Sequence, residues 1–405
     1  MSAEDREQSD DDIAEGVLPV RVSEVAVPMA LDKLQPWHRP RKQFIRERQW
    51  VARSKLLLEH VPKSRLPVNA DGNREIRYLT LPGIDYLDVV ELGRACRTEG
   101  LQLTSTSFFA SHETSRSVAR AQVREEALIG EGVITRHSQT FYRRFEEIET
   151  TTGAAYKELV ERGPFQVVNI DACGSIAPAD YKHPQRLIEA LHRLIEFQLD
   201  ACSTRWVLFV TSDVRKENFS DETLERLYQA IRMNARSEKE FEEGFIQLLS
   251  ADAPDFEEAL RIGHETDELA FIKCFSLGLA KWMLHLAGEK NWSLKVHQSY
   301  FYSTDGADTA AKAGQTSRPT MPCLAFEFLP PEPGLRDRFQ ASKAAPLPTK
   351  YSENFSLRAL SKVSEMLDLD AMMLSDSELS SEMKNRMRTE LAAAGYAAEA
   401  LEQLG

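Results

Sequence analysis

The amino-acid sequence predicts an α/β fold, with an open, mostly parallel, twisted sheet of about seven strands, helices on both faces and a terminal antiparallel hairpin. Five short apolar runs alternate with segments of helical periodicity, and parallel strands need such helical crossovers. Two further strand-like runs are joined by an Ala/Gly/Thr-rich stretch instead of a helical pattern, which indicates an antiparallel pair. The five runs are residues 76–82, 101–109, 132–138, 165–171 and 206–212, and the pair is 293–303 and 322–330.

The chain before the first strand divides by charge. Residues 1–34 form an acidic tail that we expect to be disordered, since the first fifteen residues hold seven acids and one arginine. Residues 35–75 form a basic helical segment, in which residues 37–55 carry five arginines and two lysines against Glu47. Phe44, Val51 and Leu58 recur every seven residues there, which predicts a helix with one buried stripe.

The helices between the strands follow from apolar spacing and from their end signals. Residues 85–98 form the first, which ends at Gly100, and residues 115–127 form the second. A helical region over 141–162 follows the third strand. The fourth strand, 165–171, is apolar enough to be buried on both faces, as parallel strands are. A further helix follows near Pro184.

The remaining chain adds helices to the sheet domain, which spans residues 76–330. Residues 217–290 are a helical insertion, because they far exceed the roughly dozen residues that one crossover needs. Residues 331–350 form a linker, and residues 351–405 form a C-terminal helical segment.

Composition indicates a soluble cytoplasmic protein without a metal. No run approaches the roughly 20 apolar residues of a membrane span, and the acidic N-terminus is not a secretory signal. The five cysteines contain no C-x-x-C pair, which favours reduced thiols over disulfides or zinc. The nine histidines show no metal-ligating spacing.

Element order and two short strings resemble the class I S-adenosylmethionine-dependent methyltransferases, over roughly residues 76–330. Tyr78-Leu-Thr-Leu-Pro-Gly-Ile-Asp85 occupies the place of that family's first glycine-rich loop. Asn169-Ile-Asp-Ala-Cys-Gly-Ser175 occupies the place of its fourth motif, and is similar to the Asp-Pro-Phe/Tyr-Gly string of tRNA guanosine methyltransferases and of the three-Cys-motif partner proteins of bacterial defence loci. The basic helix before the first strand also resembles the latter group.

The resemblance implies a site for S-adenosylmethionine where the first and fourth strands end side by side. Only Gly83 remains of the glycine-rich loop, and either Ser111 or Glu113 would replace the usual ribose-binding acid. The alternative is that Gly83 is an ordinary turn and Asp85 an N-cap. The cofactor-binding residues that the resemblance implies are Leu81, Gly83, Asp85, Ser111, Glu113, Ser138 and Asp171.

Asp171 is the candidate catalytic residue. A carboxylate at the end of a buried strand is costly unless it is hydrogen-bonded or meets solvent in a cleft. In methyl transfer it would accept hydrogen bonds from the exocyclic amine of a base and so orient the nitrogen lone pair. The alternative is that Asp171 caps the turn at Gly174 and Ser175.

The basic segment is the candidate nucleic-acid surface. Arginine and lysine side chains there could contact phosphates, which position a nucleic acid without reading its sequence. Trp37 and Trp50 could stack on bases, although a core position is the alternative for Trp50. The basic segment could instead dock the acidic insertion, or be solvated. The cations in question are Arg39, Arg41, Lys42, Arg46 and Arg48.

Two functions follow from these patterns. The first is a methyltransferase-like protein that acts on or binds nucleic acid. The second is a catalytically degenerate methyltransferase-fold subunit, which serves as a binding component of a bacterial, anti-phage defence complex. In that case the acidic insertion or the C-terminal helices would contact a protein partner. The substrate, the methyl-acceptor atom and the oligomeric state stay open.

Overall fold

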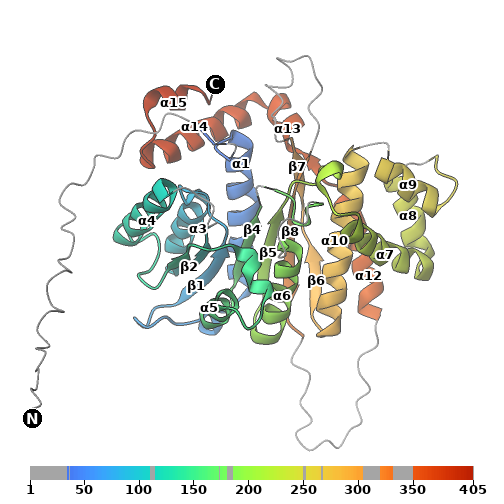
Figure 1. Ribbon diagram of the computed structural model, residues 1–405, viewed down its shortest axis with the longest axis horizontal. Coiled ribbons are helices and arrows are strands. Elements are labelled where there is room, and N and C mark those ends of the chain that lie inside the picture. The colour runs from blue at the N-terminus through green and yellow to red at the C-terminus, as the bar shows by residue number, and fades with distance from the viewer. Residues whose placement is uncertain are drawn as a thin grey trace, which may run out of the picture.

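The computed structural model describes residues 34–35, 37–109, 115–172, 174–179, 186–249, 252–265, 268–303, 320–331 and 350–404. The structure is α/β, as the sequence predicts, and the described residues form one mixed sheet of nine strands (Figure 1). Of the predicted tail, only residue 34 is described, and of the predicted linker only residues 331 and 350. The rest of both predictions lies outside the described residues.

The sheet runs in the order β3-β2-β1-β4-β5-β8-β7-β9, with β6 also paired to β8. The pairs from β3 to β5 are parallel, whereas β8 is antiparallel to β5, β6 and β7. The strands are β1 (Glu75–Thr80), β2 (Gln102–Phe108), β3 (Gln139–Phe141), β4 (Val167–Asp171), β5 (Trp206–Thr211), β6 (Ser293–Val296), β7 (Tyr300–Tyr302), β8 (Met321–Leu329) and β9 (Leu367–Asp368).

The third strand differs from its prediction. The apolar run 132–138 is a turn, and β3 begins only at Gln139. Gly132 has a φ of +67°, a left-handed conformation that ends the preceding helix, and Val133 then donates its N–H to the carbonyl of Leu128. Val133 and Ile134 are buried because they cover that helix end, so their apolar character reflects a cap and not a strand.

The predicted strand 293–303 is divided into β6 and β7 by a bulge. Val296 pairs with Phe326 and Tyr300 pairs with Cys323, so four residue steps on one strand face three on the other. One extra residue in an antiparallel pair bends the strand locally. The two short strands therefore correspond to a single predicted one.

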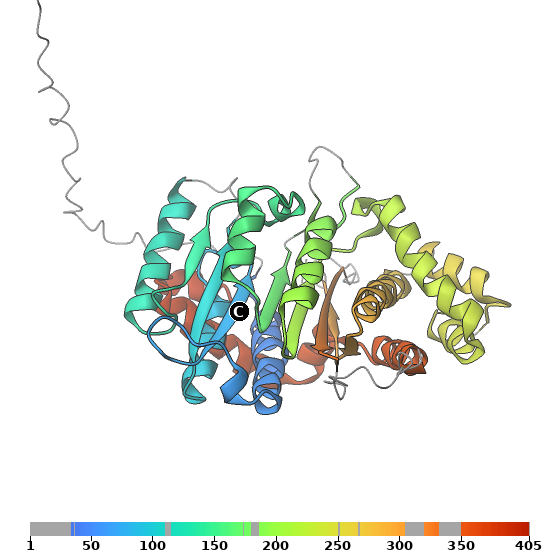
Figure 2. The ribbon, with the colours of Figure 1, turned by 90° about the horizontal axis from the view of Figure 1, so that it is seen from below.

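Helices cover both faces of the sheet, and Figure 2 shows α6 on one side and the N-terminal helices on the other. Along a strand, successive side chains point to opposite faces of the sheet. They therefore belong alternately to two hydrophobic clusters, one on each face. The helices that connect the parallel strands are α3 (Leu87–Thr98), α4 (Ser115–Gly130), α5 (Ala154–Arg162) and α6 (Leu187–Ala201). Short 3₁₀ segments lie before β1 at Lys63–Arg65, between β3 and α5 at Phe145–Glu149, and after β5 at Lys216–Asn218.

The basic N-terminal segment is one long helical stretch whose middle is a π-helix. It consists of α1 (Pro40–Phe44), the π-helix η1 (Ile45–Val51) and α2 (Ala52–His60). Its side chains at Ile45 and Trp50 are buried against the sheet. The C-terminal helices α13 (Leu369–Ser375), α14 (Ser377–Ala393) and α15 (Ala398–Glu402) lie across its beginning (Figure 1).

The predicted helical insertion consists of α7 (Asp221–Ser237), α8 (Lys239–Leu249), α9 (Phe256–Glu265) and α10 (Glu268–Glu289), and α12 (Lys350–Ser364) packs against α10. Among the described helices, α10 is long and apolar enough to cross a membrane. However, 72% of its most apolar window is buried inside the protein, against helices such as α7 and α9. It is therefore the core helix of this bundle.

Candidate functional site

The candidate site lies where β1 and β4 end. These strands are parallel neighbours, and the N–H of Leu81 donates to the carbonyl of Asn169 at 3.3 Å just beyond their paired residues. The chain winds outwards from this pair in both directions, through β2 and β3 on one side and β5 on the other. Such a switch point is where open α/β sheets usually bind ligands.

Lys42 from α1 occupies the end of β4. Its Nζ lies 2.5 Å from Oδ1 of Asp171 and 3.4 Å from the hydroxyl of Tyr302. The Lys42 side chain is 6% exposed and that of Asp171 is 19% exposed. Burial by itself would lower the pKa of Lys42, but the negative charge of Asp171 outweighs it and the pKa is raised. Lys42 is thus a fixed cation at this strand end.

Asp85 follows β1 and is also fully paired. Its Oδ2 lies 2.9 Å from Nε2 of His38 and accepts a hydrogen bond of 2.9 Å from the hydroxyl of Tyr396, while its Oδ1 lies 2.5 Å from Nη2 of Arg120. Burial would raise the pKa of Asp85, but the contact with His38 and the charge of Arg120 outweigh it and the pKa is lowered. Asp85 therefore joins three elements and does not face a ligand.

Gly83 is covered by the indole of Trp37. A Cβ placed at Gly83 would lie 3.0 Å from Nε1 and 3.4 Å from Cδ1 of that ring. The close backbone approach that a glycine permits is thus used by the protein's own tryptophan. Leu81, beside it, packs with the core cluster on the other face of the sheet.

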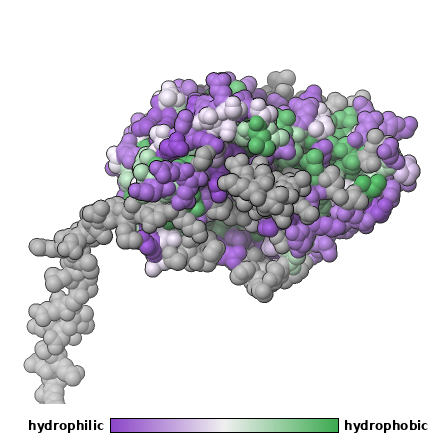
Figure 3. Space-filling view, turned by 90° about the horizontal axis from the view of Figure 1, so that it is seen from above, coloured by the Kyte–Doolittle hydropathy of each residue, from purple (hydrophilic) through white to green (hydrophobic). Residues whose placement is uncertain are grey.

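These contacts do not fit S-adenosylmethionine at the strand ends. The approach to Gly83 is taken by Trp37, Asp85 is bound on both oxygens, and Asp171 carries its own cation. Figure 3 shows that the face carrying the C-terminal helices is largely hydrophilic, with only scattered hydrophobic patches. Within the described ranges, no group of three or more His, Cys, Asp or Glu side chains is arranged to hold a metal ion.

Among the described residues, Ser138 is not brought together with Gly83, Asp85 and Asp171. Ser138 precedes β3, and its hydroxyl accepts a hydrogen bond of 3.0 Å from the N–H of Ser105. Because Ser105 lies in the middle of β2, Ser138 is a structural link away from the strand ends, which corrects its prediction as a loop residue after the third strand. Ser111 and Glu113 lie outside the described residues.

The basic segment is mostly turned inwards. Arg41, Lys42 and Arg46 are all less than 9% exposed, so these three cannot contact a phosphate backbone in this conformation. Arg41 pairs with Asp370 of α13 at 2.8 Å, and Nη2 of Arg46 donates to the carbonyl of Trp37 at 3.1 Å. Arg39 and Arg48 are exposed.

The C-terminal partners of this region were not predicted from the sequence. Asp370, Tyr396 and Glu390 bind Arg41, Asp85 and Arg94, respectively. The one available signal was the excess of cations in residues 37–55 on an acidic chain, which suggested an internal acidic partner. The acidic insertion was one alternative for that partner, whereas the acids that bind Lys42 and Arg41 are Asp171 at the end of β4 and Asp370 of α13.

Fold and site together define an α/β protein whose strand-end crevice is filled by side chains from its own N- and C-terminal helices. Residues 31–404 match the family model described as PP_RS20740-like, so the chain belongs to the PP_RS20740-like family. No curated protein matches the sequence.

Proposed function

We propose that this chain is a binding subunit with a methyltransferase-like α/β fold and without S-adenosylmethionine chemistry, and that it works in the cytoplasm as part of a multiprotein complex. The resemblance to three-Cys-motif partner proteins extends the proposal to a bacterial defence complex. The ion pair between Lys42 and Asp171 is the observation that carries it. A cation held on the candidate catalytic carboxylate removes the acceptor that a base amine would need.

The strand order supports the methyltransferase-like part of this proposal. Three parallel strands lie on one side of β4, and β5 and then an antiparallel strand follow on the other. This agrees with the terminal antiparallel pair that the resemblance implies. Since function depends on the site and not on the fold, the filled strand ends weigh more than the strand order.

The burial of the basic segment supports a protein partner over a nucleic acid. Non-specific nucleic-acid binding depends on exposed lysine and arginine side chains that neutralise phosphates. Three of the five candidate cations are engaged in buried contacts, which leaves Arg39 and Arg48. The acidic helices α7 to α9 and the C-terminal helices are then the surfaces for a partner.

Titration calorimetry with S-adenosylmethionine tests the absence of cofactor chemistry. The intact protein is expected to give no binding heat at millimolar cofactor, because Trp37 and Lys42 occupy the positions that the cofactor and base would take. Trp37→Ala is the matched variant, since it uncovers Gly83 without changing a charge.

Clear binding by the intact protein that Asp85→Ala weakens would overturn the proposal. Binding that appears only in Trp37→Ala would instead favour the second candidate, a methyltransferase whose site is covered by its own N-terminal segment. The observation behind this second candidate is that Asp85 and Asp171 still lie at the two strand ends of the switch point.

A further inference from the structure

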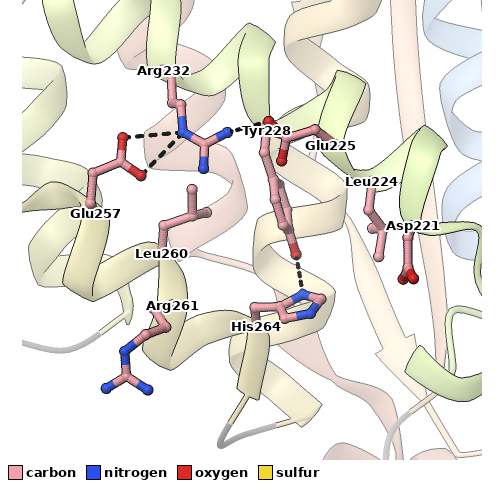
Figure 4. Close-up of a pocket in the computed structure, with 9 residues that line it drawn as sticks. All are labelled: Asp221, Leu224, Glu225, Tyr228, Arg232, Glu257, Leu260, Arg261 and His264. Atoms are coloured by element: carbon pink, nitrogen blue, oxygen red, sulfur yellow. Dashed lines mark hydrogen bonds and ion pairs between the residues drawn. The ribbon is translucent and has the colours of Figure 1, made fainter.

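A cavity lies between α7 and α9, away from the filled ends of β1 and β4. This α7/α9 hollow has a volume of about 390 Å³, and Figure 4 shows Tyr228 and Arg232 of α7 reaching to His264 and Glu257 of α9. Tyr228 lies in it, with its hydroxyl 3.1 Å from Nδ1 of His264. The hollow is lined by Asp221, Leu224, Glu225, Tyr228, Arg232, Glu257, Leu260, Arg261 and His264.

Carboxylates outnumber cations in and around the hollow. Nε of Arg232 lies 3.1 Å from both oxygens of Glu257, and its Nη1 lies 2.8 Å from Glu225. Arg261 is likewise bound by two acids, Glu258 and Glu265. With Asp221, which is exposed at the rim, three carboxylates and two guanidinium groups line the hollow, and Glu258, Glu265 and Lys216 lie around it, so five acids stand against three cations. The arginines are therefore already neutralised.

His264 does not offset the excess of negative charge in and around the hollow. Burial is the main cause that lowers the pKa of His264, and the charge of Lys216 lowers it further. The imidazole is thus neutral near pH 7, and the hollow attracts cations.

The floor of the hollow is apolar and can pack against the aliphatic part of a long side chain. Leu224, Tyr228 and Leu260 are each less than 9% exposed and form its inner wall. A lysine or arginine side chain combines an apolar stem with a cationic end, and an aromatic ring such as that of Tyr228 attracts such a cation. A volume of this size lies in the lower range of binding pockets.

The chain's own basic segment is not the occupant. Its buried cations Lys42 and Arg41 already pair with Asp171 of β4 and Asp370 of α13, which do not line the hollow. We propose that the α7/α9 hollow receives a lysine or arginine side chain from a basic segment of a protein partner. This inference rests on the proposed function, because it names the kind of partner that such a subunit would bind.

Fluorescence anisotropy with a short fluorescein-labelled peptide of lysine and leucine tests the site on the intact protein. Asp221→Lys places a cation at the rim and is expected to weaken binding by about fivefold or more, by charge repulsion. Asp252→Lys makes the same charge change at an exposed position that does not line the hollow, and less than about a twofold loss is expected.

A photo-cross-linking version of the peptide provides an independent readout and should attach to α7 or α9. Equal weakening by both substitutions, absence of peptide binding, or attachment elsewhere would each overturn the inference. Binding of S-adenosylmethionine by the intact protein would overturn the proposed function but would not change the peptide affinities or the cross-linking site. A failure of the proposed function is therefore distinguishable from a failure of this inference.

Discussion

Asp171 illustrates how the two-residue period of a strand decides what a side chain meets. Val168 and Ile170 of β4 belong to the cluster under α6, whereas Val167 belongs to the cluster under the N-terminal helices. Residue 171 has the same parity as residue 167, so its carboxylate points towards α1. Lys42 is the cation that the long helical segment brings to that position.

Lys42→Met is expected to lower the free energy of unfolding by about 3 kcal/mol, because it leaves the largely buried carboxylate of Asp171 without its cation. Urea denaturation followed by circular dichroism measures the loss. The matched control is Lys290→Met, whose pair with Asp200 is exposed on both sides, so this substitution is expected to leave the free energy of unfolding nearly unchanged. Equal stability of Lys42→Met and the parent protein would show that the pair is not structurally important.

Residue patterns predicted the candidate acids but not their partners. Asp171 was recognisable as a carboxylate at the end of a buried apolar run, and Asp85 by its place in the string that resembles the first glycine-rich loop of the methyltransferases. His38, Arg120 and Tyr396 come from three separate elements, and their convergence on Asp85 depends on tertiary packing. A helical pattern gives no information about which distant carboxylate a lysine will meet.

The N-terminal helical stretch both packs on the sheet and covers the end of β4. In its π-helix, Gln49 donates from Nε2 to the carbonyl of Cys323 at 2.9 Å, which ties the helix to β8. The same stretch carries Lys42 to the end of β4. Wider turns of this kind are often found at functional positions.

The C-terminal helices contact this stretch directly, through the ion pairs of Arg41 with Asp370 and of Arg386 with Glu47, and they are themselves anchored on Leu87 of α3 by a small apolar cluster. Leu391 of α14 is fully buried there beside Met387 and Leu87. Leu391→Ala is expected to cost about 3 kcal/mol of unfolding free energy and to raise hydrogen exchange in both α14 and α1. Mass-spectrometric hydrogen exchange measures the second effect.

Leu374→Ala is the control for this substitution, since Leu374 lies on α13 but is 67% exposed. It should leave exchange in α1 unchanged. If Leu391→Ala increases exchange in α14 alone, the C-terminal helices do not support the N-terminal segment.

At the scale of the whole molecule, the helical insertion and the sheet share one core. A single cluster of buried residues contains Phe245 of α8, Phe275 of α10, Leu194 of α6 and Phe326 of β8. The sequence predicts residues 217–290 as a helical insertion within the sheet domain. The order of the elements was predictable, but this continuity was not, because it depends on the way α10 packs against β6 and β8.

The shared core predicts a single unfolding transition. In differential scanning calorimetry the calorimetric and van't Hoff enthalpies should agree, since helices α7 to α10 cannot separate without exposing the same apolar side chains. Two resolved transitions would mean that the helical insertion is an independent domain.

The contact between Leu34 and the cluster around Leu404 has a consequence for synthesis. On the ribosome the nine-stranded sheet emerges before α14 and α15, so Asp85 has only His38 and Arg120 as partners until Tyr396 is made. The ends of β1 and β4 are therefore covered first from the N-terminal side by Trp37 and Lys42, and the contacts of Leu34 and of Tyr396 form only once the C-terminal helices are made.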